Sequence, residues 1–234
     1  MKNTAWNIPN VRKSDGTYLD SKADNLKREA RTELALKKGS QKHEELLEIE
    51  LALVCKNEST VDYLWFITDL IRQLKSHNII VGPGDGSSSS SVLCYALGIS
   101  SIDPLKFELM PECSYNNLMG LPNININVAS DDEGEVICYF HELYGNHFAR
   151  VMRHGELLPK VAFSSNDLSV SKYASFELIN EDDIDLTLVL NVSDDNVMKK
   201  YDFEEEGIIT VNILGFNSLY ELRDVDFANI PLDD

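Results

Sequence analysis

A glycine-rich loop between two apolar segments constrains the fold of this chain more than any other feature. Residues 79–81 (Ile-Ile-Val) are typical of a short buried strand and run directly into the loop Gly82-Pro83-Gly84-Asp85-Gly86. Five serines follow at 87–91, and residues 92–97 then predict an apolar helix that Gly98 ends. A strand, a glycine loop and a helix in this order can aim backbone N–H groups at an anion.

The loop taken alone does not identify a ligand. It lacks the Lys-Ser/Thr pair that follows the glycines of a Walker A motif, and Ser89 stands where a dinucleotide-binding fingerprint has its third glycine. A simple structural role explains the loop equally well, because the glycines would form a tight turn and Ser87 would cap the following helix. Both interpretations stay open on these residues.

A second strand, predicted at residues 121–128, carries amides along one face. Asparagines alternate with aliphatic residues here, and strict alternation places the two kinds on opposite faces of a strand. Asparagine is disfavoured in strands, so a face made of three amides is unusual. The asparagines are Asn123, Asn125 and Asn127, and the aliphatic residues are Ile124, Ile126 and Val128.

Helix and strand patterns account for most of the remaining chain, after an extended arm at residues 1–17. Ser40 is expected to cap one helix, another is expected to begin at Ser59 or Thr60, and Ser130 with Glu133 has the pattern of a capping box. The other expected segments are helices at 21–38, 43–55 and 215–223, strands at 186–192 and 207–214, and a less regular stretch at 155–206 with an acidic turn at 181–185.

The charge of the chain is strongly negative and unevenly distributed. Its 21 Lys and Arg residues compare with 39 Asp and Glu residues, which gives a formal net charge of −18. Residues 1–42 carry ten basic and five acidic side chains, so they are positive by 5 and the remainder is negative by 23. A negative field repels phosphate backbones, so weak or no binding of nucleic acid is expected. A DNA-binding accessory that uses the basic 1–42 segment is therefore the least favoured function.

Cysteine, histidine and hydropathy patterns exclude several other classes. The four cysteines lie apart without a Cys-x-x-Cys pair, and the five histidines are dispersed, so neither a zinc site nor a disulfide framework is indicated. Apolar runs are shorter than the roughly 18 residues of a membrane helix, and residues 1–13 lack the apolar core of a signal peptide. A cytoplasmic protein with no membrane partner is expected.

Four blocks of the chain resemble, in the right order, the bacterial DNA polymerase III alpha subunit, a C-family replicative polymerase. Residues 82–109 (GPGDGSSSSSVLCYALGISSIDPLKFEL) resemble its GPGRGSxxGS loop, short helix and LGIxxxDPLxF segment. Residues 122–128 (PNININV) and 132–145 resemble its PDIDIDF strand and the following helix, which ends in Tyr-Gly. Residues 207–219 (GIITVNILGFNSL) resemble its last palm strand, GLxKFDFLGLxxL, and residues 43–71 its upstream helices.

The resemblance covers about residues 40–225 and implies a fold and a domain division. The implied fold is α+β, a nucleotidyltransferase-type palm with a mixed β-sheet and flanking helices, preceded by N-terminal helices. Residues 1–39 are then a basic N-terminal arm and helix, and residues 40–234 are a palm-like domain in which 155–206 form a shortened insertion.

The residues that carry catalysis in the family are replaced in this chain. Asn125 and Asn127 align with two aspartates of the PDIDIDF strand and Asn212 with the aspartate of the last palm strand, which hold two Mg²⁺ ions in the family. An amide oxygen offers geometry without the negative charge that a hard divalent cation needs. The positions that align with basic residues of the family, which offset triphosphate charge, are Asp85, Cys113 and Thr210.

These departures imply a catalytically inactive homologue of the palm that acts as a binding or scaffold protein. We expect no metal ion and no cofactor, and a protein partner whose identity the sequence does not give. An engineered Asp→Asn knockout would leave the changes at Asp85, Cys113 and Thr210 unexplained. The alternative is a residual nucleotide-binding or DNA polymerase module associated with replication. Its phosphate would lie against the backbone amides of Gly84, Gly86, Ser87 and Ser88.

Overall fold

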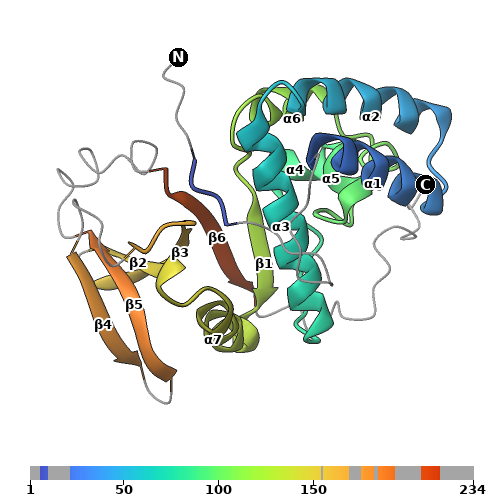
Figure 1. Ribbon diagram of the computed structural model, residues 1–234. Helices are drawn as coiled ribbons and strands as arrows, with labels where there is room; N and C mark the ends of the chain where they lie inside the picture. The colour runs from blue at the N-terminus through green and yellow to red at the C-terminus, as the bar shows by residue number, and fades with distance from the viewer. Residues whose placement is uncertain are drawn as a thin grey trace. The chain divides into compact units, whose positions relative to one another are not determined.

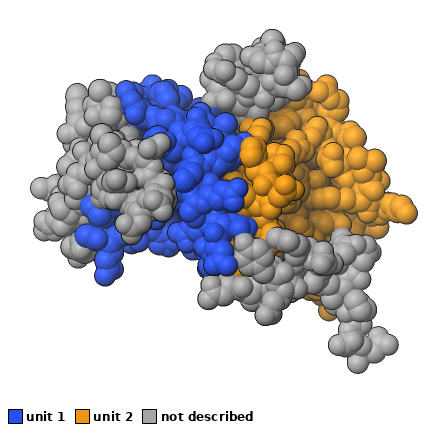
Figure 2. Space-filling view, turned by 90° about the horizontal axis from the view of Figure 1, so that it is seen from below, with its two compact units in different colours: residues 1–9, 130–215 blue, residues 10–129, 216–234 orange. Residues whose placement is uncertain are grey.

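The computed structural model of the chain describes residues 6–9, 22–153, 155–168, 175–181, 184–192 and 207–216. The chain divides into two compact units, which Figure 2 colours separately. Unit 1 comprises residues 1–9 and 130–215, and unit 2 comprises residues 10–129 and 216–234. Figure 1 labels the helices and strands of both units.

Unit 2 is built mainly from helices around the long helix α3 (Glu58–Ser76). Apolar residues recur along α3 at helical spacing and are buried, as the sequence predicts. Its start at Ser59 or Thr60 was wrong, because Asn57 is the N-cap and its side chain accepts a hydrogen bond from Ser59 N at 3.0 Å. The other elements of unit 2 are α1 (Lys22–Leu36), α2 (Gln41–Val54), α4 (Gly86–Ser89), α5 (Val92–Leu97), α6 (Glu112–Leu118) and β1 (Asn125–Ala129).

Helix α2 has the N-cap that the sequence predicts, in a capping box, although it begins at Gln41 rather than at residue 43. Ser40 is the N-cap, and its N–H donates to His43 Nδ1 at 3.1 Å. His43 Nδ1 is therefore an acceptor, and the opposite nitrogen, Nε2, donates to Asp103 Oδ1 at 2.9 Å. Burial opposes ionisation of Asp103, but the hydrogen bonds from His43 and from the Leu105 and Lys106 N–H groups outweigh it and lower its pKa.

Unit 1 contains a mixed sheet with a helix packed against it. Its strands lie in the order β6-β3-β2-β5-β4, with β2 antiparallel to β3 and parallel to β5. Helix α7 packs on β2 and β5, where Phe140 makes edge-to-face contacts with Phe148 and Phe163. The predicted α+β class with a mixed sheet is confirmed. The bounds are α7 (Glu133–Tyr144), β2 (Phe148–Arg153), β3 (Glu156–Phe163), β4 (Ser175–Glu181), β5 (Ile184–Val192) and β6 (Ile209–Phe216), with short 3₁₀ turns at Ser130–Asp132 and Gly145–His147.

Several predicted boundaries were wrong. Ser130 and Glu133 form no capping box, because residues 130–132 make a 3₁₀ turn and α7 begins after Asp132, whose side chain makes no cap bond. Residues 79–81 form no strand, because Val81 makes an isolated bridge to Val128. The second strand begins at residue 125 rather than 121.

The C-terminal half also differs from the expected pattern. The less regular stretch at 155–206 contains β3, β4 and β5, the last of which confirms the strand expected at 186–192. The strand expected at 207–214 is β6, displaced by two residues. Gly215 and Phe216 belong to β6, and the rest of the helix expected at 215–223 lies outside the described residues. The acidic turn expected at 181–185 overlaps the end of β4 and the start of β5. Residues 182 and 183 lie outside the described residues.

The expected division of the chain at residues 39 and 40 stays a prediction. Helix α1 packs against α3 and α5 within unit 2. Residues 6–9, in contrast, belong to unit 1, where Asn7 N donates to Gly207 O at 2.7 Å and Ser165 N donates to Asn7 O at 2.6 Å. Within the described ranges, no helix is long and apolar enough to cross a membrane.

Candidate functional site

The glycine loop lies beside β1 in unit 2. Val81 forms an antiparallel bridge with Val128, and Gly82 N donates to Asn127 O at 2.7 Å. Two residues later Gly84 has φ +97°, a conformation that favours glycine, and a Cβ there would lie 3.3 Å from Ser100 Cβ. The loop therefore turns sharply as soon as it leaves the strand, as its glycines predict.

One side-chain hydrogen bond links the loop to the asparagine face of β1. Asn125 Nδ2 donates to Asp85 Oδ1 at 2.9 Å. The two-residue period of β1 places Asn127 on the same face as Asn125, while Ile126 and Val128 are buried on the other. The loop carboxylate that could have attracted a cation is thus an acceptor for an amide N–H.

Two polar atoms near this loop are buried without a partner. Within the described part of the chain, neither Asn127 Oδ1 nor Ser89 Oγ has a hydrogen-bond partner. A buried polar group left unpaired costs about 1–3 kcal/mol. The interior of unit 2 next to the loop therefore contains polar atoms that do not contribute hydrogen bonds to the fold.

Two serines after the loop donate hydrogen bonds from their hydroxyls to backbone carbonyl groups. Ser88 Oγ donates to Asp85 O at 2.6 Å, and Ser90 Oγ donates to Ser87 O at 3.0 Å. The expected role of Ser87 as a helix cap was wrong, because Asp85 is the N-cap of α4, and Ser91 caps α5 by accepting from Cys94 N at 3.0 Å. A phosphate cradle made of Gly84, Gly86, Ser87 and Ser88 backbone amides remains a prediction.

A buried glutamate that sequence reasoning missed holds the helix after this loop. Glu50 of α2 is fully buried, and its Oε2 accepts from Ser91 Oγ at 2.8 Å and from Leu93 N at 2.6 Å. Its Oε1 accepts from Val92 N and from Ser114 Oγ, both at 3.2 Å. The carboxylate therefore binds the first N–H groups of α5 and also holds α6.

Burial raises the pKa of Glu50, although the donors of Leu93, Ser91, Val92 and Ser114 oppose the shift. A signal for this residue exists in the sequence. Glu50 stands between apolar residues on the inward face of an amphipathic helix, at a position where a glutamate is unusual.

The other predicted site residues lie in different elements and units. Cys113 is exposed on α6 in unit 2. Thr210 and Asn212 are half-buried in β6 in unit 1, where Asn212 is the register partner of Lys160. The resemblance implies that Asn125 and Asn127 lie close to Asn212, as ligands of shared metal ions do. Since Asn125 and Asn127 belong to unit 2, this stays a prediction.

Among the side chains of the described ranges, no group of three or more His, Cys, Asp or Glu residues is arranged to hold a metal ion. Amide oxygens remain at the aligned positions, and they can complete a cation site but do not supply the charge of one.

Comparisons with known proteins find the same family as the resemblance. The family model described as the bacterial DNA polymerase III alpha NTPase domain matches residues 21–208. The DNA polymerase III subunit alpha of Staphylococcus aureus (strain MRSA252) is 38% identical over 109 residues, which cover 46% of this chain and 10% of that protein. The same subunit of Staphylococcus epidermidis (strain ATCC 35984) is 39% identical over 101 residues, which cover 42% of this chain and 10% of that protein.

The chain spans about a tenth of the length of these curated relatives. The family model, in contrast, accounts for most of the chain, from the start of α1 to the start of β6. The resemblance identified from the glycine loop and the asparagine strand is confirmed, and the chain belongs to the bacterial DNA polymerase III alpha family.

Proposed function

We propose that this chain is a replication-related palm module of the DNA polymerase III alpha family that binds a protein partner and does not transfer nucleotides. Phosphoryl transfer in such a palm depends on two metal ions and on cations that offset the charge of the triphosphate. The aligned positions of this chain supply neither kind of charge. Binding is the function that a retained palm scaffold without those charges can still perform.

The hydrogen bond from Asn125 Nδ2 to Asp85 Oδ1, at 2.9 Å, is the observation that carries the proposal. A carboxylate at position 125 could not donate this bond, whereas an amide can. The bond occupies the carboxylate nearest to the asparagine face and gives the loop a stable arrangement with no cation. The amide at Asn125 thus supports the loop rather than a metal site.

Lys160 supports the same conclusion in unit 1. It is the cross-strand register partner of Asn212, and side chains at paired positions of antiparallel strands lie on the same face with Cβ atoms about 4.5–5.5 Å apart. An ammonium group next to the residue that aligns with the third aspartate opposes the approach of a divalent cation. This position therefore favours an anion or a neutral group over Mg²⁺.

A templated nucleotide-incorporation assay with Mg²⁺ and Mn²⁺ tests the proposal. We expect no incorporation above background by the natural chain, or by a variant with aspartate restored at all three asparagines. Each missing stabilising donor typically costs about 10²–10³ in rate, and the triphosphate would still meet Asp85. Asn123→Asp is the control for an added carboxylate outside the aligned positions. The restored substitutions are Asn125→Asp, Asn127→Asp and Asn212→Asp.

A second variant adds the missing cations to the restored carboxylates, through Asp85→Arg, Cys113→Arg and Thr210→Lys. Incorporation by this variant alone would agree with the proposal. It would show that the natural chain lacks both the metal-binding carboxylates and the cations that catalysis needs. Incorporation by the natural chain, or by the three-aspartate variant, would refute the proposal. Circular dichroism of each variant separates loss of activity from loss of folding.

The buried, unpaired Asn127 Oδ1 and Ser89 Oγ favour residual nucleotide binding as a second candidate, because a ligand or water at the loop could satisfy them. A ligand at one hundred times its Kd stabilises the folded state by about 2.7 kcal/mol. Melting curves with and without Mg²⁺ and a deoxynucleoside triphosphate test this. We expect no shift, and a concentration-dependent rise in Tm would favour nucleotide binding over the proposed function.

A further inference from the structure

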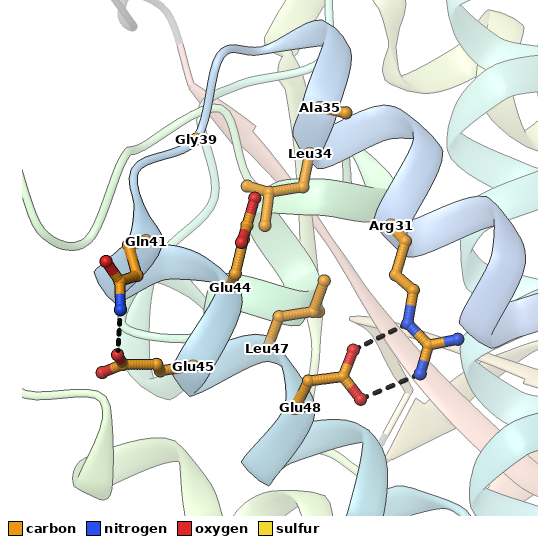
Figure 3. Close-up of a pocket in the computed structure, with 9 residues that line it drawn as sticks. All are labelled: Arg31, Leu34, Ala35, Gly39, Gln41, Glu44, Glu45, Leu47 and Glu48. Atoms are coloured by element: carbon orange, nitrogen blue, oxygen red, sulfur yellow. Dashed lines mark hydrogen bonds and ion pairs between the residues drawn. The ribbon is translucent and has the colours of Figure 1, made fainter.

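A groove of about 470 Å³ lies between α1 and α2 in unit 2. Figure 3 shows its lining residues as sticks. Among the apolar residues of the lining, Ala35 of α1 is exposed, whereas Leu34 of α1 and Leu47 of α2 are almost fully buried. Leu36, which follows at the end of α1, is 70% exposed and leaves a further apolar side chain on this end of the helix.

The connection between the two helices sets the shape of this groove. Gly39 lies between them, and a Cβ at this position would approach Leu34 Cγ and Cδ1 to 2.7 Å and His43 Cβ to 3.4 Å. The chain can therefore pass close to Leu34 only with glycine here. The groove is a consequence of this tight connection and of the capping box that fixes the start of α2.

Carboxylates dominate the polar lining of the groove. Arg31 is its one cation among the lining residues, and two hydrogen bonds to Glu48 at 2.7 and 2.8 Å already occupy it. Those bonds lower the pKa of Glu48, so the pair is fully ionised at neutral pH. Glu45 accepts from Gln41 Nε2 at 3.1 Å.

Glu44 is the carboxylate that the groove leaves available. Among the described residues its side chain has no hydrogen-bond or ion-pair partner. Figure 3 shows it extending from α2 toward Leu34, across the space between the helices. An unpaired carboxylate above an apolar surface suits a cation on an apolar stem.

We propose that this groove binds a basic segment of the partner protein, with the aliphatic stem of a lysine or arginine on the exposed Ala35 and its charge at Glu44. The inference deepens the proposed binding function by naming the chemistry of the partner. Charge complementarity selects this occupant, because three carboxylates and one paired guanidinium leave the lining negative. The same charges disfavour a nucleic-acid backbone.

Fluorescence anisotropy of a labelled peptide of alternating lysine and leucine tests the groove. We expect saturable binding to the full chain that weakens as NaCl screens the charges, and no binding of the same peptide with glutamate in place of lysine. Glu44→Gln should weaken binding about 1.5-fold to fivefold, the range for one solvent-exposed ion pair. Ala35→Arg should abolish it by filling the groove with a cation.

Two matched variants separate the groove from the general negative charge of the chain. Glu142→Gln removes an exposed carboxylate from α7, and Ala52→Arg adds a cation to an exposed position of α2 outside the groove lining. Both should bind the lysine peptide like the natural chain. The proposal is overturned if Glu44→Gln and Ala35→Arg bind no more weakly than these controls.

A different occupant would also overturn it. If sedimentation shows a dimer that Ala35→Arg dissociates, the groove is an interface between copies of this chain. The titration is independent of the incorporation assay. Incorporation by the natural chain would refute the proposed function while leaving the titration readable. Absence of peptide binding would refute the groove and leave the non-catalytic proposal standing.

Discussion

Replacing the buried carboxylate of Glu50 tests the connection on which the glycine loop and its helix depend. Glu50→Ala removes the acceptor for the N–H groups of Val92 and Leu93 at the start of α5. It also removes an acceptor for the hydroxyls of Ser91 and Ser114. Ser114 is less affected, since its hydroxyl also lies 2.7 Å from Pro111 O.

The size of the effect follows from the two orphaned N–H groups. Each costs about 1–3 kcal/mol when buried without a partner, which gives about 2–6 kcal/mol together. Removing a buried carboxylate returns part of this, because the folded state no longer bears its desolvation. We therefore expect a loss of about 2–4 kcal/mol in the free energy of unfolding. At roughly 2–4 °C per kcal/mol for domains of this size, Tm should fall by about 4–16 °C.

Urea and thermal unfolding of unit 2 measure this loss. The chain has two tryptophans, of which Trp65 is buried in α3 and Trp6 belongs to unit 1, so a Trp6→Phe background makes fluorescence report on unit 2. Glu48→Ala is the matched control on the same helix, where an exposed ion pair contributes less than about 1 kcal/mol. If Glu50→Ala destabilises no more than Glu48→Ala, the carboxylate does not hold α5.

Three further outcomes are expected. Since burial raises the folded-state pKa of Glu50 above 4.5, protonation favours folding. The stability of the natural chain relative to Glu50→Gln should therefore be greatest below pH 4.5 and fall as pH rises through the raised pKa. Urea titrations in which this relative stability rises with pH would contradict the prediction. Gly84→Ala should lower Tm more than Gly98→Ala, because both glycines have positive φ but only the former meets a neighbour, Ser100. Millimolar Mg²⁺ should leave the Tm of the natural chain unchanged and raise that of the variant with aspartate restored at the three asparagines, which should be the less stable of the two without metal.

The sequence predicts the helices of unit 2 where the spacing of apolar residues is enough to identify a helix. Helix α3 combines apolar residues at helical spacing with a capping side chain. Only its start was missed, because the helix begins at Glu58 after the N-cap Asn57 and not at Ser59 or Thr60. Helix α6 has few apolar residues, so no periodic pattern predicts it. It forms where Ser114 reaches the buried Glu50, a contact between residues 64 positions apart.

The sheet of unit 1 depends even more on contacts between residues that are distant in the sequence. Strand β3 contains Pro159 and Lys160, which interrupt a period-two pattern. Strand β2 pairs in parallel with β5, which follows about forty residues later, so its identity as a strand depends on long-range pairing. Local propensity could not supply that information, whereas the order of family blocks predicted the class of fold correctly.

At the candidate site, the sequence predicted the components but not their connection. Gly84 indicated a tight turn and the alternation in β1 indicated a common face for Asn125 and Asn127, and both are present. The bond between Asp85 and Asn125 joins residues 40 positions apart. It depends on the bridge between Val81 and β1, which no local pattern specifies.

That bond also implies that two departures from the family are one coupled change. With an amide at 125, Asp85 accepts a hydrogen bond; Asn125→Asp alone would place two carboxylates about 2.9 Å apart and raise the pKa of one of them. Asp85→Asn together with Asn125→Asp reverses donor and acceptor and should restore the bond. A double-mutant cycle in urea should therefore give a coupling of about 1–3 kcal/mol at neutral pH, vanishing in acid when the carboxylates are protonated. Additive effects at neutral pH would mean that the two side chains are not coupled, and that the amide at position 125 is not what stabilises the loop.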